Sequence, residues 1–192
     1  RGCARRCQQA GVELHPGHAP TLDELNALHP YAILDATGGL PAVPARIPGA
    51  QDSSLVCTPP DILTGKLQPT GEVIAVIGSG MTGLETAELL SAPEKDNAVL
   101  VVEAAPRLAP GVYGSNRNAV TAVLDQNNAV CLTSRALTKV GTDRIYLTDP
   151  QTGEEYTYPC QRVVLALGTT PTKPYGEALE TVCSRVLYVG DA

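Results

Sequence analysis

The stretch that decides the fold is Val73-Ile74-Ala75-Val76-Ile77-Gly78-Ser79-Gly80-Met81-Thr82-Gly83-Leu84-Glu85-Thr86-Ala87. Five apolar residues run directly into the pattern Gly-x-Gly-x-x-Gly. A continuous β-branched run that ends at glycine is typical of a buried parallel strand. The apolar residues after the glycines have helical spacing, so the stretch predicts a strand, a tight turn and a helix.

Each glycine of this pattern has its own physical role in a dinucleotide-binding turn. Gly78 permits the turn, Gly80 lets a pyrophosphate approach the backbone, and Gly83 allows the helix to pack closely on the strand. The anion would lie against the unpaired amides and the positive dipole end of the helix N-terminus. We therefore expect the turn to form the cofactor-binding loop, with its residues Gly78, Ser79, Gly80, Met81, Thr82 and Gly83.

The next strand supplies a second element of the same site. Residues 98–102 form another buried strand, followed by Glu103, which lies 20 residues beyond Gly83. This is where a dinucleotide-binding fold carries the acid that bonds the adenosine ribose. A carboxylate there favours NADH over NADPH, whereas Arg107, four residues on, could reverse this preference. The alternatives are an ordinary strand-helix-strand turn and the methyl-donor loop of methyltransferases; both fit the third glycine and the acid less well.

Composition excludes several classes of function. The 192-residue chain has a net charge of −6, a pI near 5.0 and only 4% aromatic residues, which argues against a nucleic-acid partner. No apolar run approaches the roughly 18 residues that span a membrane. Six cysteines lack C-x-x-C spacing, and His15 with His18 lacks a third ligand, so we expect no metal site. Free thiols favour a reducing, cytoplasmic location.

The sequence of the first third of the chain predicts short helices and strands. We expect a helix ending near Ala10, a strand at 12–14, and a helix from Thr21 to about Leu28 whose Glu24 completes a capping box. A strand follows within 31–39. Its Asp35 is a carboxylate in an apolar run, which must either face solvent or meet a polar partner. A proline-stiffened connector at 41–49 then leads to a short helix at 61–63.

The remainder alternates between strands and helices before a run of short strands. The first crossover helix should end near Ser91, before Pro93; a loop covers 106–114, and a second helix covers 118–124. A third strand is expected at 129–132, then an antiparallel meander from the runs 136–140, 144–148 and 155–158, with a strong turn at 149–153. A buried strand at 162–167 and a closing strand at 186–189 follow. The fold class is α/β: a Rossmann-like three-layer domain with a parallel sheet and a β-meander.

Several further motifs, in order, resemble one family. The chain is similar to the C-terminal nucleotide-binding half of the NADH:flavin oxidoreductases, the multidomain relatives of old yellow enzyme such as 2,4-dienoyl-CoA reductase and enoate reductase, within the two-dinucleotide-fold flavoproteins. The matching segments are 36–38, 44–49, 61–66, 76–88, 102–103 with 106–111, 165–168 and 190–191. The resemblance covers nearly the whole chain.

This resemblance implies a domain organisation and further site residues. Residues 40–166 would be an NAD(P)H-binding domain inserted into a partial FAD-binding domain made of 1–39 and 167–192. Glu85 matches a glutamate near the nicotinamide, Gly168 a turn lining that end, and Asp191 the residue that bonds the ribityl chain of FAD. The FAD glycine loop of the family falls outside the chain, so we expect a fragment whose FAD site is incomplete.

The expected function is delivery of hydride from NADH, or from NADPH, to a flavin. No residue of the chain is assigned a catalytic role, because the cofactors supply the chemistry. The expected partners are the nicotinamide dinucleotide and the missing flavin and substrate domains, with no nucleic acid and no membrane. Two alternatives remain open: a non-catalytic dinucleotide-binding redox sensor, and part of a pyridine nucleotide-disulfide reductase, which needs a redox cysteine pair that this chain does not reach.

Overall fold

The computed structural model describes residues 2–192 and divides the chain into two compact units. One unit is the continuous segment Leu40–Thr170. The other combines the segment up to Gly39 with Pro171–Ala192, so it is built from both ends of the chain. The crossings between the units carry β2 (Gly39–Pro41) and β11 (Thr169–Pro171), which pair as a two-stranded sheet.

The unit 40–170 is organised around a five-stranded sheet in which all neighbouring strands are parallel. Its order is β3-β10-β4-β5-β6, where the strands are β3 (Val56–Cys57), β10 (Arg162–Leu165), β4 (Val73–Ile77), β5 (Ala98–Val102) and β6 (Val130–Leu132). The central strand β4 therefore has β10 on one side and β5 on the other. Its last four residues are buried, as the continuous apolar run predicts.

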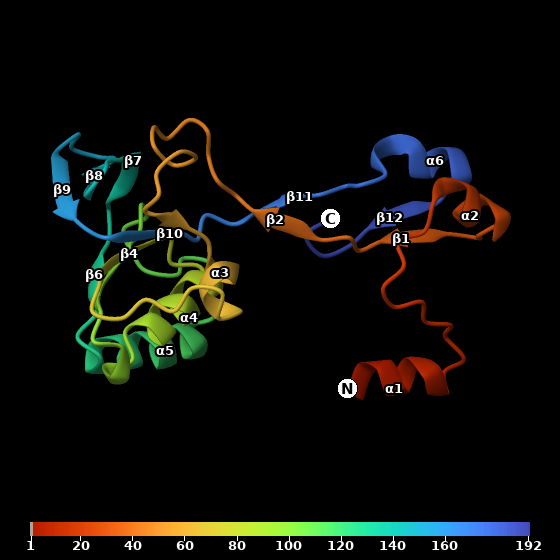
Figure 1. Ribbon diagram of the computed structural model, residues 1–192, viewed down its shortest axis with the longest axis horizontal. Helices are drawn as coiled ribbons and strands as arrows, with labels where there is room; N and C mark the ends of the chain where they lie inside the picture. Colours follow the sequence, from red (N-terminus) through yellow and green to blue (C-terminus); the bar gives the residue numbers. More distant parts are fainter. Residues whose placement is uncertain (1) are drawn as a thin grey trace. The chain divides into compact units, whose positions relative to one another are not determined.

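Helices cover one face of this sheet and a β-meander covers the other (Figure 1). The helices are α3 (Pro59–Leu63), α4 (Met81–Leu90) and α5 (Gly114–Gln126), with a short 3-10 turn η1 (Pro93–Lys95). The antiparallel meander is β7 (Ala136–Val140), β8 (Arg144–Thr148) and β9 (Glu155–Pro159). The fold is thus the expected α/β arrangement of three layers.

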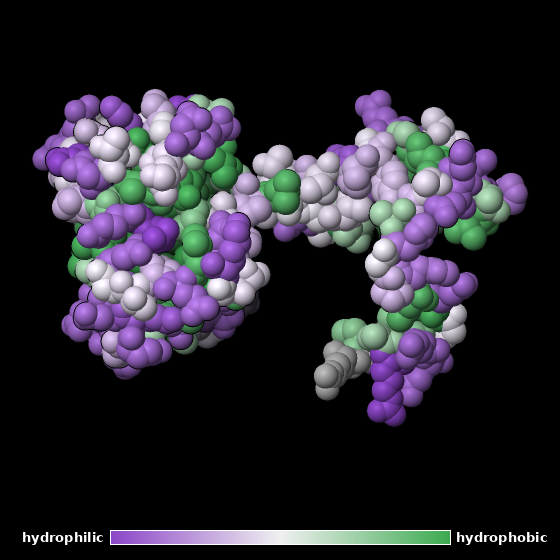
Figure 2. All heavy atoms as spheres, viewed as in Figure 1, coloured by the Kyte–Doolittle hydropathy of each residue, from purple (hydrophilic) through white to green (hydrophobic). Residues whose placement is uncertain are grey.

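Each face of the sheet has its own hydrophobic core. Alternate residues of β4 divide between them: Ile74 and Val76 pack on the helix side, and Ala75 and Ile77 on the meander side. Leu84 of α4 and Leu124 of α5 are fully buried in the first core, and Ile145 of β8 is fully buried in the second. Figure 2 shows apolar residues of this unit in a band between hydrophilic outer parts.

The unit built from the two chain ends is smaller and more exposed. It contains α1 (Gly2–Gln9), α2 (Leu22–Ala27), β1 (Ile33–Asp35), η2 (Gly176–Ala178), α6 (Leu179–Val182) and β12 (Val186–Tyr188). Strands β1 and β12 pair in parallel, with Ile33 opposite Val186. The capping box expected for α2 is present, since the hydroxyl of Thr21 accepts from the amide of Glu24 at 3.2 Å and the Glu24 carboxylate accepts from the amide of Thr21 at 2.7 Å.

Asp35 meets a polar partner inside this unit rather than solvent. Its carboxyl is 4% exposed, and Oδ1 accepts hydrogen bonds from the amide and hydroxyl of Thr37 at 3.0 and 2.7 Å. Oδ2 has no hydrogen-bond partner among the residues described. A short loop at the end of β1 thus provides the partner that the strand pattern could not reveal.

One expected strand and one expected helix boundary are wrong. Residues 12–14 form no strand; the segment is coil, with Val12 49% exposed, and no strand among residues 2–192 pairs with it. Helix α5 begins at Gly114 rather than 118, because its polar first turn forms helical hydrogen bonds without contributing to the apolar pattern; the amide of Arg117 donates to the carbonyl of Tyr113 at 3.0 Å. The loop expected to reach 114 is correspondingly shorter.

Candidate functional site

A cavity of about 530 Å³ opens at the carboxyl ends of β4, β5 and β10. The turns that follow these strands supply part of its wall: Gly78, Ser79 and Gly80 after β4, Glu103 and Ala104 after β5, and Ala166 and Leu167 after β10. Chain connectivity reverses direction here, because β4 leads through α4 to β5 on one side, whereas its other neighbour β10 comes much later in the chain. Open α/β sheets bind ligands at such a switch point.

The three glycines of the first turn have distinct surroundings. Gly78 has φ +100°, and a β-carbon there would overlap the carbonyl oxygen of Ala166. A β-carbon on Gly83 would overlap the carbonyl oxygen of Gly78, so the helix lies directly against the turn. Gly80 is different, because no heavy atom lies within 4 Å of a β-carbon placed on it. Packing requires glycine at positions 78 and 83, whereas Gly80 faces open space.

Helix α4 presents its N-terminus beside that open space. Gly80 is its N-cap, no side chain caps the helix, and the first helical hydrogen bond runs from the amide of Leu84 to the carbonyl of Gly80 at 2.9 Å. The amides of the first turn, including those of Met81 and Thr82, therefore have no acceptor within the helix. This arrangement favours an anion, and it fits the diphosphate of a dinucleotide.

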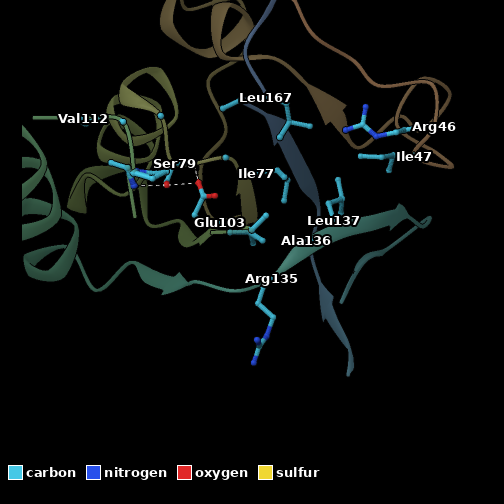
Figure 3. A pocket seen from close by; sticks show the side chains of 18 residues that line it. Arg46, Ile47, Ile77, Ser79, Glu103, Val112, Arg135, Ala136, Leu137 and Leu167 are labelled. Carbon is cyan, nitrogen blue, oxygen red and sulfur yellow. Dashed lines mark hydrogen bonds between the residues drawn. The ribbon is translucent and has the colours of Figure 1, made fainter. Parts of the chain in front are cut away.

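Glu103 points back toward the glycine turn (Figure 3). Its Oε2 accepts hydrogen bonds from the Ser79 hydroxyl at 2.6 Å and from the Ser79 amide at 3.0 Å, and its Oε1 accepts from the Ala105 amide at 2.8 Å. The carboxylate is therefore held at the cavity wall by donors from two loops. Burial by itself raises the pKa of Glu103, but the hydrogen bonds from Ser79 and Ala105 outweigh this effect and bring the pKa below its ordinary value. Glu103 is ionised at neutral pH.

The opposite wall comes from segments that the sequence did not indicate. Arg46 and Ile47, from the loop before β3, and Leu137, from β7, line the cavity across from Ser79 and Glu103 (Figure 3). Arg46 is exposed and adds a positive charge to the wall. The sequence signals for this loop are its prolines, which predict a fixed connector at 41–49, and its resemblance to the family at 44–49; neither predicts contact with a site.

Arg135 also lines the cavity, but its charge is engaged elsewhere. Its guanidinium donates to the Asp149 carboxylate at 3.0 Å and lies 3.9 Å from the centre of the Tyr156 ring. In Figure 3 it extends away from Glu103. Arg135 therefore stabilises the start of the meander. Arg46, the other arginine of the cavity wall, has no ion pair among residues 2–192.

Several of the expected site residues lie outside the cavity wall. Arg107 is exposed, and its guanidinium donates to the carbonyl of Pro110 at 3.5 Å. Glu85 is exposed on α4, and Gly168 follows β10 with φ +89°. Asp191 belongs to the unit formed by the chain ends. The residues from the expected set that line the cavity are Gly78, Ser79, Gly80 and Glu103; Met81, Thr82, Gly83, Glu85, Arg107 and Gly168 do not.

Metal and thiol chemistry find no support in the part of the chain that the structure describes. No group of three or more His, Cys, Asp or Glu side chains there is placed to hold a metal ion. The six cysteines are free, and burial raises the pKa of Cys57 and of Cys160 to about 11. These two thiols stay protonated at neutral pH and are poor nucleophiles. No helix among these residues has the length and apolar character needed to cross a membrane.

Comparison with known proteins identifies relatives of this chain. It is 29% identical over 187 residues to an NADH oxidase of Thermoanaerobacter brockii and 27% identical over 184 residues to a bilirubin reductase of Mediterraneibacter gnavus (strain CC55_001C). These matches cover 96% and 94% of the chain but only 28% and 27% of the relatives, so the chain spans little more than a quarter of their length.

The solved structures include a similar fold. A 2-naphthoyl-CoA reductase in complex with 2-naphthoyl-CoA superposes with a TM-score of 0.81 at 24% identity, over 98% of this chain and 28% of that one. The model of the pyridine nucleotide-disulphide oxidoreductase family matches residues 6–189. This is an oxidoreductase family whose members use NAD(P)H and FAD, as the sequence led us to expect. The strand order, the glycine turn and this match together establish that the chain belongs to the pyridine nucleotide-disulphide oxidoreductase family.

Proposed function

We propose that residues 40–166 bind NADH and present its nicotinamide to a flavin, as the nucleotide-binding module of a flavin-dependent oxidoreductase. The observation that carries this proposal is the juxtaposition of two features in one cavity. Gly80 faces open space at an uncapped helix N-terminus, and the ionised Glu103 lies on the wall beside it. One feature suits a diphosphate and the other a ribose hydroxyl.

The residues would divide the dinucleotide among them. The amides from Gly80 to Thr82 would bind the diphosphate, because those of Gly78 and Ser79 already donate to the Val102 carbonyl and to Glu103. Gly78 would shape the turn, and Glu103 would accept from the adenosine ribose. The nicotinamide end would extend toward Ala166 and Leu167 after β10, with Gly168 and Glu85 as further candidates on that side. When bound, the nicotinamide supplies the hydride and the flavin accepts it, while the protein provides binding and orientation.

The flavin side of the proposal concerns the other unit. We assign the segments 1–39 and 167–192 to a partial FAD-type domain in which Asp191 bonds the ribityl chain, with the remaining flavin and substrate domains supplied by other parts of a longer protein. We place the chain in the branch of NADH:flavin oxidoreductases related to old yellow enzyme. The resemblance of residues 61–66 supports this choice, and the share of the NADH oxidase that the chain covers, 28%, supports a longer parent protein.

Calorimetric titration of the 192-residue chain with NADH, NADPH and FAD in parallel tests the proposal. We expect NADH to bind with one site per chain and FAD to bind weakly or not at all. Gly80→Val should abolish NADH binding without unfolding the chain, because φ −59° suits valine and no heavy atom lies within 4 Å of a β-carbon there. Gly114→Ala, at the start of α5 and outside the cavity, is the matched control.

The outcomes separate the alternatives. Failure of both dinucleotides to bind, or undiminished binding by Gly80→Val, would overturn the proposal. Tight FAD binding would overturn the assignment of a partial flavin site. A redox sensor would bind NADH equally well but would not pass electrons to a flavin, so anaerobic reduction of added FAD by NADH, followed in the full-length protein, distinguishes the sensor from the oxidoreductase.

A further inference from the structure

Ser79 does not offer its side chain to the cavity. The residue is fully buried, and its hydroxyl donates to Glu103 Oε2 at 2.6 Å. The hydroxyl oxygen of Ser79 also accepts from the amide of Ala109 at 2.8 Å. One hydroxyl thus joins three segments: the glycine turn, the end of β5 and the loop that leads to α5. Both hydrogen-bonding roles of the hydroxyl are used inside the protein.

The hydrogen bonds to Glu103 leave little capacity for a ligand. A carboxylate accepts about four hydrogen bonds, two at each oxygen. Oε2 already accepts from the amide and hydroxyl of Ser79, and Oε1 accepts from the amide of Ala105. At most one acceptor position therefore remains, on Oε1, and it can accept from a single hydroxyl group. The carboxylate cannot rotate without breaking its hydrogen bonds to Ser79.

Ser79 also fixes the loop that carries Arg107. Ala109 is fully buried with φ +47°, an uncommon conformation for alanine, and its amide is held by the Ser79 hydroxyl. Arg107 lies two residues before it and is directed to the carbonyl of Pro110. The bond to Ala109 fixes the backbone of this loop, and Arg107, the cation nearest to it in sequence, does not line the cavity.

We propose that Ser79 is a positioning residue that restricts this site to a dinucleotide with a free 2′-hydroxyl, by holding the Glu103 carboxylate at the cavity wall and the Arg107 loop in place. This inference rests on the proposed function and deepens it. A 2′-phosphate would require the carboxylate to withdraw and a cation to approach, and the Ser79 hydroxyl opposes both movements. Glu103 discriminates between the two dinucleotides because Ser79 prevents it from moving.

The test measures the ratio of the NADPH and NADH dissociation constants by calorimetry for the wild-type chain and for Ser79→Ala. We expect the wild type to prefer NADH. In the variant the ratio of the NADPH to the NADH dissociation constant should fall about fivefold to tenfold, since a hydrogen bond to a charged group is removed. Ser91→Ala is the matched control. Its hydroxyl is also buried, donates to the Glu88 carbonyl and accepts from Asn127, both at 3.2 Å, but it lies outside the cavity.

A double-mutant cycle shows whether Ser79 acts through Glu103. In a Glu103→Gln background, Ser79→Ala should change the ratio by less than about twofold. Ser79→Cys keeps a weaker donor and acceptor and should give an intermediate ratio; it also provides the measurement if the alanine variant does not fold, which thermal unfolding reports.

The result that would overturn the inference is a Ser79→Ala variant that binds both dinucleotides less tightly by the same factor. That outcome would assign Ser79 to loop stability alone. It differs from failure of the proposed function, in which the wild-type chain itself binds neither NADH nor NADPH.

Discussion

Gly83, in the first turn of α4, lies so close to Gly78 that a β-carbon on Gly83 would overlap the carbonyl oxygen of Gly78. The overlap is with backbone, which cannot move aside as a side chain can. We therefore expect Gly83→Ala to lower the free energy of unfolding by about 1–3 kcal/mol. Urea denaturation measures this change. Gly80→Ala serves as the control and should change the unfolding midpoint little, because its β-carbon meets open space.

Glu103→Ala should change the nucleotide preference. Removing the ionised carboxylate removes both the acceptor for the ribose and the repulsion of a 2′-phosphate, so affinity for NADPH should rise relative to NADH by about tenfold or more. Parallel titrations with the two dinucleotides provide the measurement. Glu94→Ala removes the same charge outside the cavity and should leave the ratio unchanged. Equal weakening of both dinucleotides in Glu103→Ala would contradict a discriminating role for this residue.

Arg46→Ala should weaken NADH binding about threefold to tenfold, because a positive charge is removed from the wall of a site for a dianionic ligand. The loss should shrink as salt concentration rises, since exposed charges are screened. Titrations at two ionic strengths check both statements. Lys66→Ala removes a positive charge outside the cavity and is the control. A loss that is independent of salt would point to packing rather than to charge.

The carboxyl group of Asp61 should titrate with an unusually low pKa. Its pKa is lowered to about 2 by the hydrogen bonds from Lys66 and from the hydroxyl and amide of Thr58. Because the folded pKa lies below the unfolded value of about 3.9, the stability from this group is complete above about pH 4 and is lost as pH falls toward 2. NMR titration of the carboxyl carbon measures the pKa. Lys66→Met should raise it only part of the way, because both bonds from Thr58 remain.

Arg162 and Glu72 form the ion pair that we expect to matter most for stability. The guanidinium donates twice, at 2.8 and 2.9 Å, and both side chains are less than a quarter exposed (22% and 24%). Arg162→Ala should lower the free energy of unfolding by about 1.5–3 kcal/mol. Arg144→Ala breaks an equally short pair with the neighbouring Asp143, but on the surface, and should cost less than about 1 kcal/mol. Equal effects in urea denaturation would contradict this ranking.

The sequence predicts those parts of the fold that depend on neighbouring residues. The β4-turn-α4 unit follows from the apolar run and the glycines, α3 from Pro59 and Pro60, and the meander turn from Asp149, whose carboxylate accepts from the amides of Gln151 and Thr152. These elements are formed by contacts within a few residues. The coil at 12–14 reads as a strand in the sequence because the presence of a pairing partner is not a local property.

The residues of the candidate site also differ in whether the local sequence predicts them. Gly78, Gly80 and Glu103 belong to one strand-helix-strand segment, so their spacing alone predicts that they meet. Arg46 and Leu137 reach the cavity through packing between distant segments, which leaves no periodic pattern in the sequence. The role of Ser79 is also hidden, because its partner Ala109 is 30 residues away and contributes only a backbone amide.

The parallel pairing of β1 with β12 has a consequence for how the chain is made. Their partners Ile33 and Val186 are separated by about 150 residues, and the whole unit 40–170 lies between them. At translation rates of about 5–20 residues per second, β1 waits roughly 8–30 s on the ribosome before its partner strand exists. During that interval the inserted unit can complete its own core, whereas β1 must wait for the strand that it pairs with in the finished fold.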